Sequence, residues 1–262
     1  MMPNLHQGQP LLVAGEPIEK ARAAMILLHG RGATARDILA LADELYQPGF
    51  AYLAPQAASG TWYPNRFLAP TSTNEPWLSS ALAIVGDVVA LVGQHVPPEQ
   101  TILLGFSQGA CLALEYAARN ARRYGGLVGL SGALIGADGE PRHDQGSLDS
   151  TTILLGCSDV DIHIPKARVH HAAEVLGALG GSVTLRLYPD MDHTINTDEI
   201  DLVHGMMAAF PHCSPQRRVD LAVKLAYIHL TGAPSAKSHR PAETTCQSLC
   251  AALSWIWMEP FT

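Results

Sequence analysis

The chain has 262 residues, of which 47% are hydrophobic and 16% are charged, so a disordered or fibrous protein is excluded. Its length suits one large α/β domain or two small ones. The 17 basic and 24 acidic residues give a net charge of −7, which argues against nucleic acid or an anionic membrane surface as a partner.

Secretion and membrane insertion also find no support in the sequence. No apolar run approaches the roughly 18–20 residues that span a bilayer, and the first residues lack a signal-peptide pattern. The five cysteines have no paired spacing that would indicate a disulfide framework. We therefore expect a cytoplasmic protein without stable membrane association.

Short apolar runs alternate with helical patterns between about residue 10 and residue 210. In chain order, they predict a strand at 23–28, a helix at 34–45, a strand at 50–54, a helix at 78–92, a strand at 101–105, a helix at 108–119, strands at 126–130 and 152–155, a helix at 167–179, a strand at 183–187 and a helix at 198–210. Such apolar strands separated by helices predict an α/β fold with a mostly parallel, doubly wound sheet and helices on both faces. Ligand chemistry is then expected at the carboxyl ends of the strands.

The segment 56–76 interrupts this alternation, because it is rich in aromatic residues and proline. It is too aromatic for a plain solvent loop, so we expect it to fold over another part of the molecule. Five of the large apolar side chains in and just after it are candidates for a hydrophobic acyl or aryl site: Trp62, Tyr63, Phe67, Leu68 and Trp77. The alternative for each of them is ordinary core packing.

Residues 211–262 are a second anomaly, and we expect a domain at 1–210 followed by a helical carboxyl-terminal extension at 211–262. Five basic and three acidic residues give the extension a net charge of +2, whereas the whole chain is acidic. The spacing of an amphipathic helix, which needs a partner surface, is kept by Cys246, Leu249, Cys250, Leu253, Ile256 and Trp257. Three interpretations remain open: a helix for packing or for contact in a homodimer, a lid over the active site, and a non-native extension.

The sharpest local signal is the sequence G-F-S-Q-G at 105–109, which lies between a predicted strand and a predicted helix. A serine on such a tight strand-to-helix turn has a strained backbone, which the flanking glycines are expected to permit. The turn raises the hydroxyl above the sheet and directs the first amides of the helix at a reacting carbonyl. We therefore predict Ser107 as a nucleophile, with a glycine-rich structural turn as the alternative.

A serine nucleophile needs a base and an acid that orients the base, and on this fold they follow the serine in the order acid, then histidine. His193 fits the base, because it follows the predicted strand 183–187. The acid is expected after the strand 152–155, where spacing alone does not separate Asp159 from Asp161. His163 lies near a predicted helix, so we expect it to face solvent.

An oxyanion hole needs a second backbone amide besides that of Gln108, from a loop after an early strand. The sequence H-G-R-G at 29–32 offers this loop, and we expect the Arg31 amide to pair with the Gln108 amide. The alternative is a glycine-rich turn without a ligand.

Four segments in combination resemble the phospholipase/carboxylesterase family of the α/β-hydrolase superfamily: L-L-H-G-R-G-A at 27–33, G-F-S-Q-G-A at 105–110, G-C-S-D-V-D-I-H-I-P at 156–165 and Y-P-D-M-D-H at 188–193. The stretches 62–67 and 74–78 also look like the family's active-site loop. The resemblance implies an α/β-hydrolase fold without a large cap domain and a Ser-His-Asp triad with no metal or organic cofactor. In the family the acid lies four residues before a proline, which favours Asp161 over Asp159.

The sequence departs from the family pattern beside two of these residues. Ile162 stands where the family usually has proline, and Asp190 and Asp192 replace two glycines that commonly precede the histidine. Aspartate tolerates some backbone conformations less well than glycine does. We expect these departures to leave the reaction class unchanged and to affect the catalytic efficiency.

We expect a serine carboxylesterase that hydrolyses small or short-chain esters through an acyl-enzyme, with a small-molecule ester as its partner. The resemblance also allows a lysophospholipase or an acyl-protein thioesterase. A binding protein without catalysis is less consistent with the intact Ser, His and Asp candidates. A metalloenzyme built on His163, His170 and His171 is weaker still, because Pro165 separates them and adjacent histidines diverge.

Overall fold

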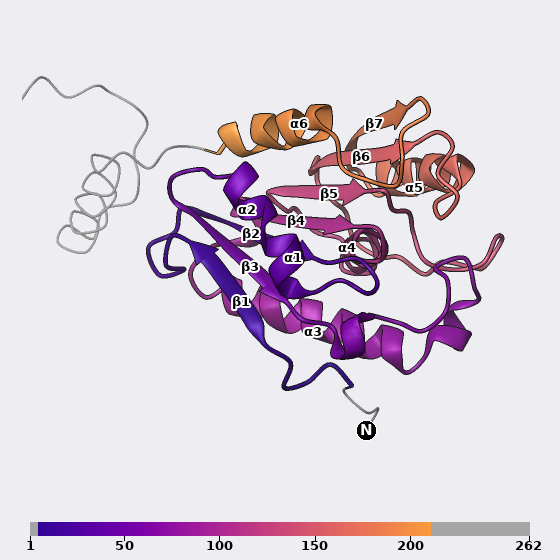
Figure 1. The fold of residues 1–262 in the computed structure, drawn as a ribbon, viewed down its shortest axis with the longest axis horizontal. Helices are drawn as coiled ribbons and strands as arrows, with labels where there is room; N and C mark the ends of the chain where they lie inside the picture. Colours follow the sequence, from indigo (N-terminus) through magenta and orange to yellow (C-terminus); the bar gives the residue numbers. More distant parts are fainter. Residues whose placement is uncertain (1–4, 211–262) are drawn as a thin grey trace, which may run out of the picture. The chain divides into compact units, whose positions relative to one another are not determined.

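Seven strands form one sheet in the computed structural model of the chain, which describes residues 5–210 (Figure 1). The strands are β1 (Leu11–Gly15), β2 (Ala23–Leu28), β3 (Phe50–Pro55), β4 (Thr101–Phe106), β5 (Gly126–Leu130), β6 (Thr152–Ser158) and β7 (Ser182–Tyr188). Their order across the sheet is β1-β3-β2-β4-β5-β6-β7. The β1 strand pairs with β3 in the antiparallel sense, and each further neighbouring pair is parallel.

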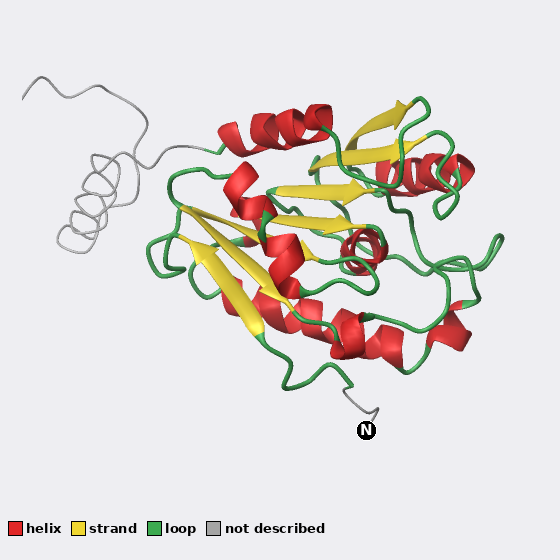
Figure 2. Cartoon of the chain, in the orientation of Figure 1, coloured by secondary structure: helices red, strands yellow, loops and turns green. Residues whose placement is uncertain are grey.

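Helices cover both faces of this sheet (Figure 2). They are α1 (Ala35–Leu39), α2 (Leu41–Glu44), α3 (Trp77–Val92), α4 (Gln108–Arg119), α5 (Lys166–Ala178) and α6 (Thr197–Ala208), with short 3-10 turns at Ala58–Gly60, Thr71–Asn74 and Pro98–Gln100. One core cluster joins α3, α4 and α5 to the sheet, and the other joins α1, α2 and α6. The predicted doubly wound α/β fold is confirmed, since β2, β3 and β5 are buried at every position.

Two local predictions differ from the structure. The helix expected at 34–45 is two short helices, α1 and α2, that meet at Ala40. The sequence analysis did not predict β1, a five-residue strand at the edge of the sheet. The burial of β1 is mostly intermediate, so its composition does not carry the signal of a fully buried strand.

Parallel strands end at the same edge of the sheet, and that geometry gathers the segments with the candidate residues. The loops after β2, β4, β6 and β7 begin at this edge. Within residues 5–210, no helix is long and apolar enough to cross a membrane. The extension predicted at 211–262, and with it the predicted helix and the homodimer contact, lies outside the described residues.

Candidate active site

Ser107 lies on a sharp turn between β4 and α4, with backbone angles φ 55° and ψ −119°. A Cβ atom on Gly105 would collide with the backbone of Gly109, and a Cβ on Gly109 would collide with the Leu28 carbonyl. Neither glycine has a positive φ. The expected reason for the glycines is therefore corrected: Ser107 itself takes the strained conformation, and the glycines allow close backbone approach around it.

The turn brings Ser107 to His193, and His193 to Asp161. The Ser107 Oγ lies 2.9 Å from His193 Nε2, and His193 Nδ1 lies 2.7 Å from Asp161 Oδ2. The Asp161 side chain has no exposed surface, whereas His193 is 23% exposed. The three side chains thus form one hydrogen-bonded chain, in which His193 lies between Ser107 and the buried Asp161.

Asp161 is held as a carboxylate by the hydrogen bonds that it accepts. Burial by itself would raise its pKa, but the hydrogen bond with His193 and the amides of His163 and Ile164 outweigh burial and lower the pKa below its ordinary value. Those two amides donate to Oδ1 over 2.7 Å and 3.0 Å. The remaining oxygen is therefore directed at the histidine, and it can stabilise an imidazolium.

The competing aspartate has a different position. Asp159 Oδ1 accepts the amide of Asp190 over 3.1 Å, and Asp190 has a φ of 52°. Asp190 stands where the family commonly has glycine, so the departure noted in the sequence falls on a left-handed backbone position. Asp159 ties this turn to the loop after β6, whereas Asp161 contacts His193.

Gln108 and Arg31, the residues predicted to supply the amides of an oxyanion hole, line the same cavity as Ser107. Gln108 is the first residue of α4, so its amide is among the unpaired donors at the positive end of the helix. The Gly30 Cα is close to Ser107, because a Cβ on it would lie 3.5 Å from the Ser107 Cβ. The loop with the Arg31 amide therefore begins beside the nucleophile.

The side chains of Gln108 and Arg31 hold the aromatic segment 56–76 in place. Gln108 Oε1 accepts the amide of Trp62 over 3.0 Å, and Gln108 Nε2 donates to the Tyr63 carbonyl over 2.8 Å. The Arg31 guanidinium donates to the carbonyls of Pro64 and Asn65 over 2.7 Å and 2.6 Å. As expected, the segment folds over another part of the molecule. Polar contacts hold it against Gln108, which follows Ser107, and against the loop after β2.

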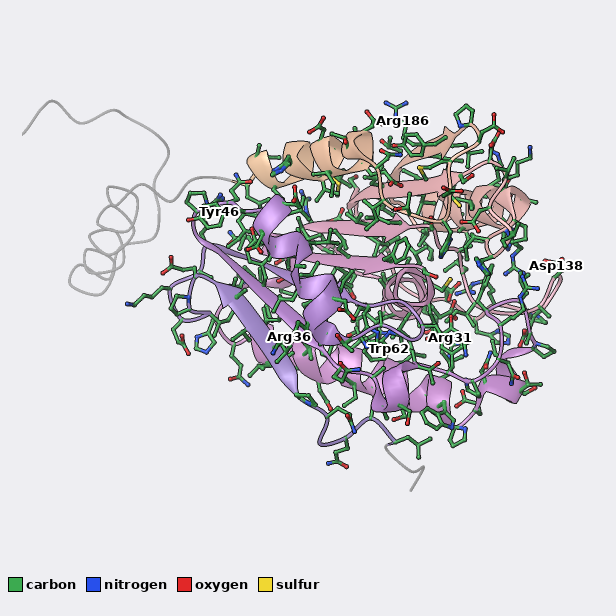
Figure 3. The ribbon with its side chains drawn as sticks, viewed as in Figure 1. Arg31, Arg36, Tyr46, Trp62, Asp138 and Arg186 are labelled. Carbon is green, nitrogen blue, oxygen red and sulfur yellow. The ribbon has the colours of Figure 1, made fainter. Side chains whose placement is uncertain are left out.

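Ser107 and His193 open into a cavity of about 290 Å³. Of the five predicted substrate-binding residues, Tyr63 and Phe67 line it. The other three lie elsewhere: Trp62, whose indole donates to the His29 carbonyl over 2.8 Å; Leu68, on a second cavity of about 910 Å³; and Trp77, whose ring lies 5.5 Å from that of His6. Trp62 is fully buried and supports the loop after β2, close to Arg31 in Figure 3. The second cavity contains neither Ser107 nor His193.

Sequence reasoning missed two residues of the catalytic cavity. His163 is exposed, as expected, but its ring also packs edge-on against that of His193 at 5.0 Å, and it lines the cavity. Arg66 also lines it. The sequence position of His163 could have predicted this placement. His163 follows Asp161 by two residues, so a loop that places Asp161 beside His193 also places His163 near it. Among the described residues, no group of three His, Cys, Asp or Glu side chains could hold a metal ion.

Comparisons with known proteins agree with this architecture. A family described as phospholipase/carboxylesterase matches residues 11–209. The chain belongs to this family. The predicted family is therefore confirmed, and with it the class of hydrolases that act on ester bonds.

Three relatives give the degree of similarity. A crystal structure of a phospholipase/carboxylesterase from Dyadobacter fermentans is 40% identical, with a TM-score of 0.73 over 77% of this chain and 97% of that one. Acyl-protein thioesterase 1 of Saccharomyces cerevisiae is 28% identical over 211 residues, which are 70% of this chain and 91% of the yeast protein. Acyl-protein thioesterase 1 of Gibberella zeae is 30% identical over 120 residues, and this match spans 44% of this chain and only half of the length of that protein.

Proposed function

We propose that this protein is a serine carboxylesterase that hydrolyses small, short-chain carboxylic esters through Ser107, His193 and Asp161. The observation that carries the proposal is the continuous hydrogen-bond path from Ser107 Oγ through His193 to Asp161, at 2.9 Å and 2.7 Å, at the edge of a cavity. Both distances are within the range in which a base takes a proton from a nucleophile.

In the proposed reaction, His193 Nε2 takes the Ser107 proton as Oγ attacks the acyl carbonyl carbon. The Gln108 and Arg31 amides stabilise the oxyanion, and a donor of this kind typically contributes about 2.7–4 kcal/mol. His193 then gives its proton to the leaving alcohol, and an acyl-enzyme remains. His193 then takes a proton from a water molecule, whose oxygen attacks the acyl carbon. The bond from this carbon to Ser107 Oγ breaks, Oγ regains a proton from His193, and the acid product leaves. Asp161 Oδ2 accepts the hydrogen bond of the His193 Nδ1–H group throughout, and the proton stays on the imidazole.

The preference for small esters is supported by the size and walls of the cavity. Its volume of about 290 Å³ is at the lower end of the range for ligand sites, which is about 300–1,000 Å³. Tyr63 and Phe67 give it aromatic walls suited to a short acyl or aryl group. The proposed setting is the cytoplasm, with a small-molecule ester as the partner and with neither nucleic acid nor stable membrane association.

A second candidate is hydrolysis of acyl groups on proteins or of lysophospholipids. The names of the yeast and Gibberella zeae relatives favour the thioesterase form of this alternative. A long acyl chain would need more room than the cavity at Ser107 offers, so this form is the runner-up.

The test is hydrolysis of p-nitrophenyl esters from acetate to palmitate by the wild type and by Ser107→Ala. We expect kcat/KM to peak at short acyl chains and to fall by at least about 10⁴-fold in the variant. A peak at long chains would favour the lysophospholipase or thioesterase. An absence of turnover that depends on Ser107 would contradict ester hydrolysis and favour a binding protein.

A further inference from the structure

We propose that the ester bound at Ser107 carries a carboxylate, and that Arg66, supported by Arg31, binds this carboxylate at the rim of the catalytic cavity. The inference rests on the proposed ester hydrolysis and adds the substrate class. The observation behind it is an accumulation of unneutralised positive charge at one site of an acidic chain.

The lining of the catalytic cavity includes two arginines, Arg31 and Arg66, and the imidazole of His163. No Asp or Glu side chain within residues 5–210 lines it. The chain as a whole has a net charge of −7, so the sign at this cavity is opposite to that of the protein. A cavity with charge of one sign attracts ligands of the other sign.

The second cavity shows that arginine is paired elsewhere on the same protein. Three arginines line it, and each has a carboxylate partner: Arg119 with Glu115 at 2.7 Å, Arg142 with Asp144 at 2.6 Å, and Arg168 with Asp138 at 2.9 Å. Within the described part of the chain, neither Arg31 nor Arg66 has an ion pair. The two arginines beside Ser107 therefore retain charge that the protein does not neutralise.

Arg31 gives this charge a fixed position. Its guanidinium donates to the carbonyls of Pro64 and Asn65, and its central carbon lies 6.0 Å from the centroid of the Tyr63 ring. Hydrogen bonds to carbonyl groups orient a guanidinium but leave its charge in place. Arg31 therefore adds a stationary positive field to the cavity.

Arg66 combines a fixed backbone with an available side chain. The buried Asn74 accepts the amide of Asn65 over 2.8 Å and donates to the Arg66 carbonyl over 3.3 Å. The exposed Arg66 guanidinium makes one long contact of 3.5 Å with the His163 carbonyl. An arginine has five N–H donors in a planar fork, so Arg66 has donors for a bidentate carboxylate.

Among the described residues, the acidic side chains near His193 form no ion pair with Arg31 or Arg66. Asp159, Asp190 and Asp192 belong to the loops around the histidine but do not line the cavity. Asp161 is fully buried and hydrogen-bonds to His193. A substrate carboxylate that enters from solvent thus encounters Arg66 and Arg31 without an acidic neighbour in the lining.

The test compares two matched pairs of esters. The first pair is mono-p-nitrophenyl glutarate and its methyl ester, which places the anion in the acyl part. The second pair is 4-acetoxybenzoate and its methyl ester, which places the anion in the alcohol part. Hydrolysis by Ser107→Ala is subtracted as background. We expect wild-type kcat/KM to favour the anionic member by about tenfold in at least one pair, and added salt to reduce that preference.

Variants assign the preference to Arg66. In Arg66→Gln the preference should fall to near unity, and Arg66→Lys should keep part of it because the charge remains but the planar fork is lost. The matched control is Arg186→Gln, an exposed arginine on β7 that Figure 3 shows away from Arg31 and that should keep the wild-type preference.

The possible failures are distinguishable. Turnover of both members of each pair without an anionic preference would overturn the inference and leave ester hydrolysis intact. A preference that survives in Arg66→Gln would overturn the assignment to Arg66. If neither member of either pair is hydrolysed through Ser107, the proposed function itself is wrong, and the inference with it.

Discussion

The loop after β6 and the first turn of α6 each remove one carboxyl group from water, and the pKa values of the two groups shift in opposite directions. Asp161 in the loop has no exposed side-chain surface, and Glu199 in the helix is likewise fully buried. The pKa of Asp161 is below its ordinary value, whereas burial raises the pKa of Glu199 to about 7. Burial is common to both, so another factor decides between a charged and a neutral carboxyl.

That factor is the number of N–H donors that the backbone and neighbours supply. Asp161 interacts with His193 Nδ1 and accepts the amides of His163 and Ile164. Glu199 Oε2 accepts one amide, that of Asn196 over 3.0 Å, and Oε1 has no donor among the described residues. One hydrogen bond does not compensate for the loss of hydration, whereas three do.

The shape of the sheet explains why Glu199 lacks donors. Its Oε1 lies against Gly156 of β6, where a Cβ atom would collide with it. The other oxygen completes a capping box with Asn196 at the start of α6, three residues after His193. Glu199 therefore helps to set the position of the segment that follows the histidine, while Asp161 contacts the histidine itself.

The largest expected effect comes from Asp161→Asn, which removes the negative charge of the buried carboxylate that three N–H groups stabilise. The asparagine amide would face His193 Nδ1 and favour the wrong tautomer, so kcat should fall by about 10⁴-fold. Asp159→Asn is the matched control and should reduce kcat by less than about tenfold, because Asp159 contacts the Asp190 amide instead. Ester hydrolysis measures both, with circular dichroism to verify folding. Equal losses in the two variants would contradict the roles given to the aspartates.

Glu199→Gln tests the second buried carboxyl group through the pH dependence of the unfolding free energy. A carboxyl group whose pKa rises on folding stabilises the fold when protonated, so its contribution is complete below the unfolded value of 4.5 and is lost as pH rises through about 7. Between about pH 5.5 and about pH 8.5, the wild type should lose about 2 kcal/mol of unfolding free energy relative to the variant, which cannot ionise. Urea unfolding at both pH values measures the difference. Parallel losses in the two proteins would show that Glu199 does not ionise in this range.

The smallest expected effect concerns Asp190, which begins the turn that leads to His193. Alanine in the left-handed conformation at φ 52° lacks the local hydrogen bonding of aspartate, so Asp190→Ala should cost about 1 kcal/mol of unfolding free energy. Asp190→Gly is the control, because glycine adopts this conformation without steric cost. Urea unfolding at one pH compares the three proteins. A glycine variant less stable than the alanine variant would mean that backbone strain is not the dominant cost.

Local patterns in the sequence determined much of the architecture. The apolar runs predicted six of the seven strands, and the helix at 108–119 has the predicted ends. These predictions succeed because burial on both faces and the start of a helix depend on adjacent residues. The pattern G-F-S-Q-G placed Ser107 on a strand-to-helix turn for a similar reason, since the close approach of Gly105 to Gly109 is set within a few residues. The approach of Gly109 to the Leu28 carbonyl, in contrast, depends on the neighbouring strand β2. The catalytic roles of Ser107, His193 and Asp161 remain predictions.

Only the tertiary structure decided which side chains meet. Spacing left Asp159 and Asp161 open, and the pairing of β6 with β7 brings Asp161 to a histidine 32 residues away. Other contacts between distant segments hold Trp62 against the His29 carbonyl, outside the lining of the cavity, whereas His163 and Arg66 line it. Glu199 of α6 likewise lies against Gly156, which belongs to strand β6. A sequence pattern records how residues alternate along the chain, whereas charge state and contact depend on neighbours that the fold supplies from distant segments.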